Sequence, residues 1–209
     1  MSSGQVVGAK TRIPRLAGLS RERIDQRLAS VWDRRLGLVV APAGSGKTTL
    51  LTQFARASGV PVGWWRAEPS DGTESLAVGH LERALVPVLD GVAGEWGSVD
   101  DIAEALDGWS GDRALIAIDD LHAIWGTEAE AALERLITML PPGMVLLAAT
   151  RRTPGFNLSR MIVSGDVLEI GQEDLRFRAW EVERLFREFY GSPMPPHELA
   201  ELALSLIHI

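Results

Sequence analysis

The chain has 209 residues, enough for one well-buried α/β domain and part of a second. Hydrophobic residues make up 46% and charged residues 23%, which is the composition of a globular protein rather than a disordered one. The net charge of −7 argues against a broad nucleic-acid-binding face, and the absence of cysteine excludes disulfides and thiolate metal sites. There is no signal-peptide core and no apolar run of about 18 residues, so we expect a cytoplasmic protein without membrane contact.

Five short hydrophobic runs alternate with segments of helical periodicity, which is the pattern of a parallel sheet wrapped by helices. Several runs are apolar throughout, as in strands covered on both faces. We expect strands at residues 36–40, 62–65, 114–118, 144–149 and 167–170. We expect helices at residues 20–32, 47–57, 74–89, 128–140 and 179–190. A capping box made by Thr127 and Glu130 is expected to start the helix at 128–140.

The segment from Ala41 to Thr49 matches the phosphate-loop pattern, except that Ala41 replaces the usual first glycine. It lies between an expected strand and an expected helix, as phosphate binding requires. The glycines would let the backbone N–H groups curl toward phosphates, and Lys47 would reach the β- and γ-phosphates. An incidental glycine-rich turn is the alternative. We predict an ATP·Mg²⁺ site with contacts from Ala43, Gly44, Ser45, Gly46, Lys47, Thr48 and Thr49, in which the Thr48 hydroxyl binds Mg²⁺.

The apolar run at 114–118 ends in two aspartates, Asp119 and Asp120. The carboxyl end of a buried parallel strand would deliver both side chains to the sheet edge beside the phosphate loop. Asp119 would bind Mg²⁺, and Asp120 would orient or deprotonate the attacking water. A strand that simply enters solvent is the alternative, and the phosphate loop upstream favours the catalytic interpretation. The adjacent acid, with the strand at 62–65 between the two motifs, indicates the ATPase branch of the fold.

Other polar and aromatic residues are weaker candidates. Arg151 follows the expected strand at 144–149 and would sense the γ-phosphate, although with Arg152 it could equally be a solvated pair. His122 could touch the site or be a half-buried histidine bonded to backbone. Trp64 and Trp65 are expected to pack the sheet rather than to stack on adenine.

In combination, these motifs resemble the ATPase module of MalT-like LuxR-family transcriptional regulators. The resemblance covers roughly residues 10 to 190. Besides the motifs above, the segments 32–36, 63–65 and 167–177 also match the family. These bacterial regulators belong to the STAND class (NB-ARC-type signal-transduction ATPases), which switch between a closed ADP form and an open ATP form. The resemblance implies that residues 10–35 form an adenine-side segment in which the stretch 19–23, including Leu19 and Arg23, lies against the base. It also implies that the full-length protein self-associates in its ATP state.

The sequence departs from the family pattern at several points. Ser45 stands where the family often has an aromatic residue, and Arg178 stands at the usual Ser or Thr helix cap. We expect a phosphate-loop domain at residues 1–171 and a truncated helical domain at 172–209, with 204–209 an artefactual tail. The winged-helix, sensor and C-terminal helix-turn-helix domains of the family are not in this chain, so we expect no direct DNA binding by it.

The sequence therefore predicts an α/β P-loop NTPase of the ATPase branch, with a five-stranded parallel sheet followed by the start of a helical domain. The resemblance implies a weak ATPase, converting ATP and water to ADP and phosphate, that serves as a transcriptional switch. One alternative is a motor or other NTPase enzyme, although transporter and helicase motifs are not recognisable. The other is a STAND ATPase with a non-transcriptional signalling output.

Overall fold

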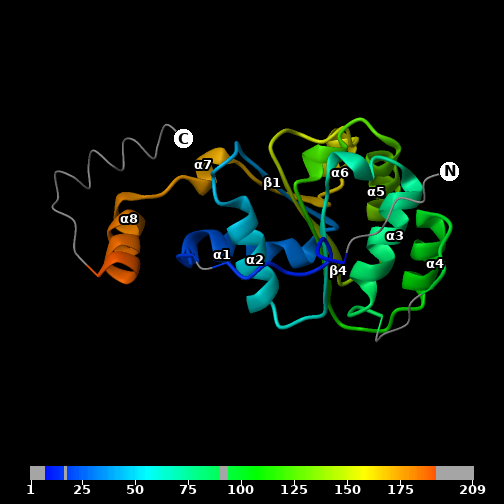
Figure 1. The fold of residues 1–209 in the computed structure, drawn as a ribbon, viewed down its shortest axis with the longest axis horizontal. Coiled ribbons are helices and arrows are strands. Elements are labelled where there is room, and N and C mark those ends of the chain that lie inside the picture. Colours follow the sequence, from blue (N-terminus) through cyan, green and yellow to red (C-terminus); the bar gives the residue numbers. More distant parts are fainter. Residues whose placement is uncertain (1–7, 17, 90–93, 192–209) are drawn as a thin grey trace.

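The structure, a computed structural model, describes residues 8–16, 18–89 and 94–191. Among these residues, one sheet of five parallel strands occupies the centre (Figure 1). The strands are β1 (Leu36–Val40), β2 (Val62–Arg66), β3 (Ala114–Asp119), β4 (Met144–Thr150) and β5 (Val167–Ile170). Their spatial order is β2-β3-β4-β1-β5, and each neighbouring pair is parallel. The expected five-stranded parallel sheet is confirmed.

Helices cover both faces of this sheet. One face packs against α1 (Glu22–Ala29) and α2 (Lys47–Ala57). The other packs against α3 (Glu74–Leu85), α4 (Val99–Asp107), α5 (Glu128–Met139) and α6 (Leu158–Val163). After β5 the chain runs through α7 (Gln172–Leu175) to α8 (Ala179–Leu185), which stands apart from the sheet in Figure 1. Short 3-10 turns lie at Ser30–Asp33, Pro69–Asp71 and Leu121–Ile124, and α8 continues into a π-helical turn at Phe186–Tyr190.

The strand side chains alternate between two hydrophobic clusters. In β3, Leu115 and Ala117 pack on the side of α1 and α2, whereas Ile116 and Ile118 pack on the side of α3 to α5. All four side chains are fully buried. Both faces of the sheet are therefore dry, which explains why this strand is apolar throughout rather than alternating. Trp64 and Trp65 likewise point to opposite clusters and are buried, so the expectation that they pack the sheet is confirmed.

The strand order determines where the phosphate loop and the two aspartates, Asp119 and Asp120, come together. Strand β4 lies between β1 and β3, so the loop after β1 and the aspartates after β3 emerge at the same sheet edge, one strand apart. The strand at Val62–Arg66 lies between the motifs in the sequence, but in the sheet it is the edge strand beside β3. Parallel sheets bind ligands at this edge, beyond the carboxyl ends of the strands.

Several element boundaries differ from those expected. The expected helix at 74–89 ends at Leu85 and continues as a turn. Helices α4 and α6 lie outside the expected set. At the start of α4, the Ser98 N–H donates to Asp101 Oδ2 at 2.9 Å and the Asp101 N–H donates to Ser98 Oγ at 3.3 Å. This is a capping box, so the local sequence did carry a signal for α4.

The capping box expected at Thr127 and Glu130 is wrong. The Thr127 hydroxyl donates to the Ile124 carbonyl at 2.6 Å, because the preceding 3-10 turn presents that carbonyl within its reach. Glu130 instead accepts from the Gly126 N–H at 2.7 Å and from the Gly155 N–H at 2.9 Å. Its buried carboxylate therefore ties the loop before α5 to the loop after β4.

Helix α8, which follows the sheet, has Arg178 rather than Ser or Thr at its N-cap. At Arg178, the backbone N–H donates to Glu181 Oε2 at 2.8 Å, which satisfies one donor at the start of α8. The division into two domains near residue 171 stays a prediction, and the tail at 204–209 lies outside the described residues. In the described part of the chain, no helix is long and apolar enough to cross a bilayer.

Candidate functional site

The loop between β1 and α2 is curled by two glycines. Gly44 has φ 82° and Gly46 has φ 79°, in the left-handed region that favours glycine. Between them, the Ser45 hydroxyl donates to the Pro42 carbonyl at 3.0 Å. Gly46 is the N-cap of α2 and no side chain caps this helix, so its first N–H groups face the loop. This arrangement of backbone donors at a helix N-terminus suits an anion.

Lys47 begins α2 and is 7% exposed. Its Nζ donates to the Pro42 carbonyl at 2.6 Å, so the side chain folds back over the loop. Burial lowers the pKa of Lys47, and the charge of Arg151 lowers it further, while Asp120 and Asp119 oppose the shift. The ammonium group is therefore held in the loop at a position where an anionic ligand would favour its charged form.

Thr48 and Asp119 meet across the sheet edge. The Thr48 hydroxyl lies 2.9 Å from Asp119 Oδ2 and 3.1 Å from Oδ1. Asp119 ends β3 and is 2% exposed, and burial raises the pKa of its carboxyl group while the Thr48 hydrogen bond opposes that shift. A hydroxyl paired with a buried carboxylate offers the oxygen ligands that Mg²⁺ prefers. The curled loop, the buried lysine and this pair therefore fit a magnesium-bound phosphate chain.

Asp120 has an unusual backbone conformation. Its φ is 55°, and it is the one non-glycine residue with positive φ in the part of the chain that the structure describes. Its N–H donates to Asp119 Oδ1 at 3.0 Å, which links the two acids. Its own carboxylate lies 3.4 Å from Nε of Arg66. Such backbone positions occur preferentially at functional sites, and here Asp120 lines a pocket while Asp119 pairs with Thr48.

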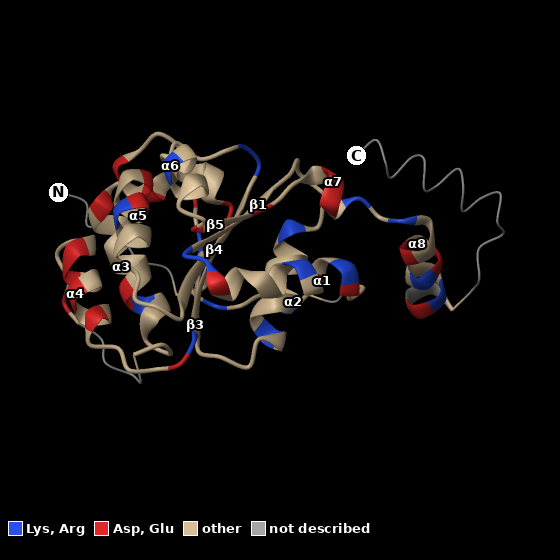
Figure 2. Cartoon of the chain, turned by 180° about the vertical axis from the view of Figure 1, so that it is seen from behind, with Lys and Arg blue, Asp and Glu red and all other residues tan. Residues whose placement is uncertain are grey.

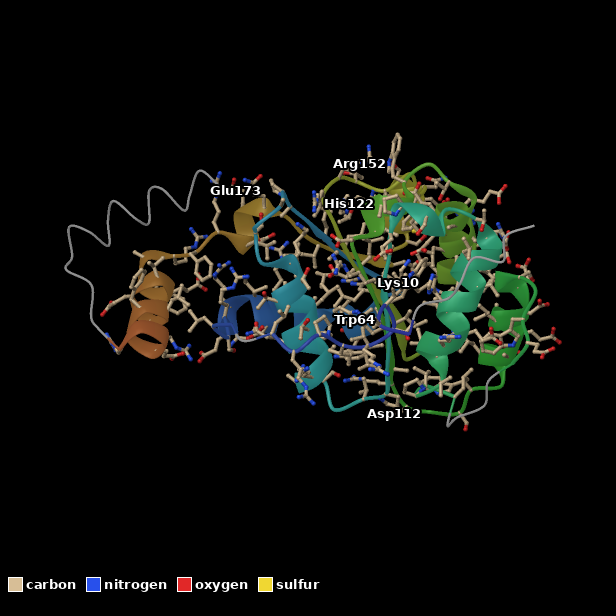
Figure 3. The ribbon with its side chains drawn as sticks, in the orientation of Figure 1. Lys10, Trp64, Asp112, His122, Arg152 and Glu173 are labelled. Carbon is tan, nitrogen blue, oxygen red and sulfur yellow. The ribbon has the colours of Figure 1, made fainter. Side chains whose placement is uncertain are left out.

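A pocket of about 430 Å³ opens beside Asp120. Arg66, His122 and Arg151 are among its lining residues. The charge of Arg151 lowers the pKa of both Lys47 and His122, so Arg151 lies within electrostatic range of the phosphate loop. Arg152 instead stacks on Trp125, with its guanidinium carbon 4.2 Å from the ring centroid. In Figure 3 the Arg152 side chain extends beyond His122, at the outer end of this region.

His122 is 18% exposed, and its Nδ1 lies 3.9 Å from Asp120 Oδ1. Among the described residues this Nδ1 has no hydrogen-bond partner, so the expected alternative of a histidine bonded to backbone does not describe it. Burial lowers the pKa of His122, and the cations Arg151 and Lys47 lower it further against the effect of Asp120. His122 therefore borders the pocket in surroundings that favour the neutral form of its ring.

The two residues expected on the adenine side lie in different surroundings. Leu19 is buried, and the Gln53 side chain of α2 donates to the preceding carbonyl, Gly18 O, at 2.8 Å. A Cβ added to Gly18 would lie 2.4 Å from a methyl group of Thr49, so this segment packs tightly against α2. Arg23 instead donates to the Arg176 carbonyl at 3.2 Å, beyond β5. The roles of Leu19 and Arg23 toward adenine stay predictions.

Arg66 lies near the site and was not expected from the sequence. It ends β2 and is directly opposite Asp119 in the strand register. The signal that could have indicated it is its position at the carboxyl end of a strand, which it shares with Asp119 and Thr150. Arg21 lies within the expected adenine-side stretch 19–23, and it is a buried cation that precedes α1. Nothing in the helical periodicity distinguishes its role from that of its arginine neighbours.

Comparison with known proteins gives both sequence relatives and fold relatives. No family model matches the sequence. The HTH-type transcriptional regulators MalT of Yersinia pestis (strain Pestoides F) and Yersinia pseudotuberculosis (serotype O:1b) are each 26% identical over 195 residues, covering 87% of this chain. The chain spans about a fifth (21%) of the length of these relatives.

Two solved structures share the fold. A STAND protein with a tetratricopeptide repeat sensor, PH0952 from Pyrococcus horikoshii, has a TM-score of 0.56 and 21% identity, covering 95% of this chain and 29% of that one. The Aeropyrum pernix ORC1 protein, solved in complex with DNA, has a TM-score of 0.55 and 17% identity, covering 92% and 56%. The expected P-loop NTPase fold of the ATPase branch is thereby confirmed. The resemblance predicted from the sequence is confirmed as well, because the chain is similar in sequence to part of the MalT regulators and shares its P-loop fold with a STAND protein.

Proposed function

We propose that this chain binds ATP with Mg²⁺ and hydrolyses it slowly, as the nucleotide switch of a transcriptional regulator. The observation that carries the proposal is the contact between the Thr48 hydroxyl and the buried carboxylate of Asp119, at the end of a loop that holds Lys47. Lys47 and Thr48 begin the helix that follows β1, whereas Asp119 ends β3, and β4 separates these two strands in the sheet. A glycine-rich turn with an incidental lysine has no reason to place them together.

Each group has a distinct role in the proposal. The backbone N–H groups from Ala43 to Thr49 would surround the phosphates, and Lys47 would neutralise the β- and γ-phosphates. Thr48 and Asp119 would hold Mg²⁺, which supplies positive charge at the terminal phosphates. Asp120 would orient or deprotonate the attacking water. ADP would occupy the same loop after hydrolysis.

Titration of the chain with a fluorescent ATP analogue tests the proposal. We expect saturable binding that strengthens when Mg²⁺ is added and that unlabelled ADP competes away. Circular dichroism on the same sample reports whether the chain is folded. A folded chain that shows no saturable binding would remove the basis of the proposal.

The regulatory output is proposed from the relatives. The MalT proteins are named HTH-type transcriptional regulators, and this chain resembles about a fifth of their length. We propose that ATP binding favours an open, self-associating form of the full-length protein and that slow hydrolysis resets it. In such a switch the rate of hydrolysis sets how long the open form lasts.

Arg151→Ala is expected to reduce discrimination between ATP and ADP more than it reduces overall affinity. A cation at the end of β4 gains most when the γ-phosphate is present, so we expect the ratio of the two Kd values to change about tenfold. Competition titrations with both nucleotides measure this ratio. Arg152→Ala is the matched control, because Arg152 stacks on Trp125. Equal losses for ATP and ADP would return Arg151 to the role of a solvated surface residue.

The chain by itself is expected to bind nucleotide without binding DNA specifically. Specific readout requires an element that presents side chains to base edges in a groove, and the acidic chain offers little non-specific affinity in its place. A mobility-shift assay with competitor DNA measures this. Sequence-specific retardation by this chain would show that a recognition element had been overlooked.

Steady-state turnover separates the switch from an NTPase enzyme. We expect phosphate release far below the rates of about 1–10³ s⁻¹ that are typical of metabolic enzymes. Turnover within that range would favour the enzyme alternative.

A further inference from the structure

Three arginines of the N-terminal segment hold the chain that follows β5. Arg21 Nη1 donates to the Leu175 carbonyl at 2.6 Å, and Arg23 Nη2 donates to the Arg176 carbonyl at 3.2 Å. From the last turn of α1, Arg27 donates to the Asp174 carboxylate in α7, and its Nη2 donates to the Glu169 carbonyl of β5 at 3.0 Å. Figure 2 shows the basic residues of α1 and the acidic residues of α7 on the same side of the sheet. The exit from the sheet is thus fastened to the N-terminal segment by cations that reach backbone carbonyls.

Arg21 differs from the other two because it also lies close to the phosphate loop. It is 6% exposed, and its guanidinium carbon lies 4.8 Å from the centroid of the Phe177 ring. A Cβ added to Gly46, the residue that precedes α2, would lie 4.0 Å from Arg21 Nη2. A single planar group is therefore near both the N-terminus of α2 and the turn that leads from α7 to α8.

A buried guanidinium has little freedom at such a position. Its donors must stay bonded, since an unpaired buried charge is strongly unfavourable. Burial lowers the pKa of Arg21, and the charge of the buried Glu181 carboxylate, which lies 3.5 Å from Arg23 Nη2, opposes that shift. Because the guanidinium lies close to Gly46, a shift of the loop would alter its packing and, through it, the hydrogen bond to the Leu175 carbonyl and the stacking on Phe177. The planar guanidinium group donates to the Leu175 carbonyl and stacks on Phe177 at the same time, which the ammonium group of a lysine cannot do.

We propose that Arg21 is a positioning residue that couples the phosphate loop to helices α7 and α8, so that nucleotide at the loop changes the stability of the exit from the sheet. This inference rests on the proposed nucleotide binding, and it identifies the residue through which binding at the loop would affect α7 and α8. Arg27 fastens the same connection without reaching the loop, so it supplies a matched control.

Hydrogen–deuterium exchange of peptides covering residues 172–185 tests the coupling, with and without ATP·Mg²⁺ at concentrations that saturate each variant. In the unmodified chain we expect nucleotide to change the exchange rate of these peptides by about fivefold or more. Fivefold is the lower end of the range that is usual for coupling between two sites. In Arg21→Lys we expect that nucleotide-dependent difference to disappear. In Arg27→Lys exchange rises with and without nucleotide, and the difference between the two conditions remains. A purely structural Arg21 would behave like Arg27.

A second variant keeps the test independent of the folding of Arg21→Lys. Phe177→Leu removes the ring on which Arg21 stacks and leaves the charge in place, and we expect it to diminish the same nucleotide-dependent difference. An unchanged difference in both variants would overturn the coupling. So would an unmodified chain that binds nucleotide without any change at 172–185, and in that case the proposed function stands. A folded chain that binds no nucleotide overturns the function and the coupling together.

Discussion

Lys47→Ala is expected to weaken ATP binding by about two orders of magnitude. The substitution removes the ammonium group that lies folded over the phosphate loop, 2.6 Å from the Pro42 carbonyl. Removing one partner of a desolvated charge pair costs about 3 kcal/mol, and each 1.4 kcal/mol is roughly tenfold in Kd. Titration with a fluorescent ATP analogue in the presence of Mg²⁺ measures the change.

Arg56→Ala is the control for this substitution. It removes an exposed cation from the last turn of the same helix, where the side chain donates to the Pro14 carbonyl at 2.8 Å. Its ATP affinity should stay within about twofold of the unmodified chain, as expected for an exposed charge far from the bound group. Unchanged affinity in a folded Lys47→Ala protein would contradict the assignment of the loop.

Asp120→Asn is expected to lower ATP turnover by roughly 10²–10⁴-fold, the usual contribution of a general base, while nucleotide binding persists. The amide keeps the shape of the side chain but does not accept a proton from water. Asp120 lines the pocket, whereas the Asp119 carboxylate is paired with the Thr48 hydroxyl, so Asp120 is the acid of the two that is available to act on a water molecule. Phosphate release in the full-length protein is the measurement, since turnover by this chain is expected to be slow.

Two further aspartates make this result specific. Asp119→Asn should weaken the Mg²⁺ dependence of binding, because its carboxylate meets the Thr48 hydroxyl. Asp112→Asn should change neither quantity, since this exposed residue lies before β3, at the opposite end of the strand (Figure 3). Normal turnover in Asp120→Asn would mean that another group activates the water. In that case the ion pair between Arg66 Nε and the Asp120 carboxylate, at 3.4 Å, would not serve catalysis.

The sheet and the phosphate loop could be predicted because their signals are local. A continuous apolar run such as the one in β3 marks a strand buried on both faces, and the loop motif must follow a strand and open a helix. The aspartates after β3 become informative once that loop is known. All five expected strands are present, and three of them extend one residue further, to Arg66, Asp119 and Thr150.

The rest depended on contacts between distant residues. The Thr127 hydroxyl bonds to the turn before it, and Glu130 bonds to a loop 25 residues away, so a local capping rule failed. Arg66 and Asp120 meet because β2 pairs with β3, and Arg21 reaches Leu175 across 154 residues of sequence. No periodicity encodes such pairs. The left-handed conformation of Asp120 is likewise absent from any pattern of residue types, since two adjacent aspartates after a strand do not specify their backbone angles.

The position of β4 between β1 and β3 has a consequence for synthesis of the chain. The phosphate loop and the two aspartates are translated before residue 121, yet the strand that separates and aligns them ends only at Thr150. Until that segment leaves the ribosome, β1 has neither of its neighbours, because β5 is translated later still. The nascent chain therefore carries the proposed magnesium and phosphate ligands for some seconds, at about 5–20 residues per second, before they can face one another. Binding competence should appear abruptly in a series of ribosome-stalled chains, once the segment containing β4 has emerged.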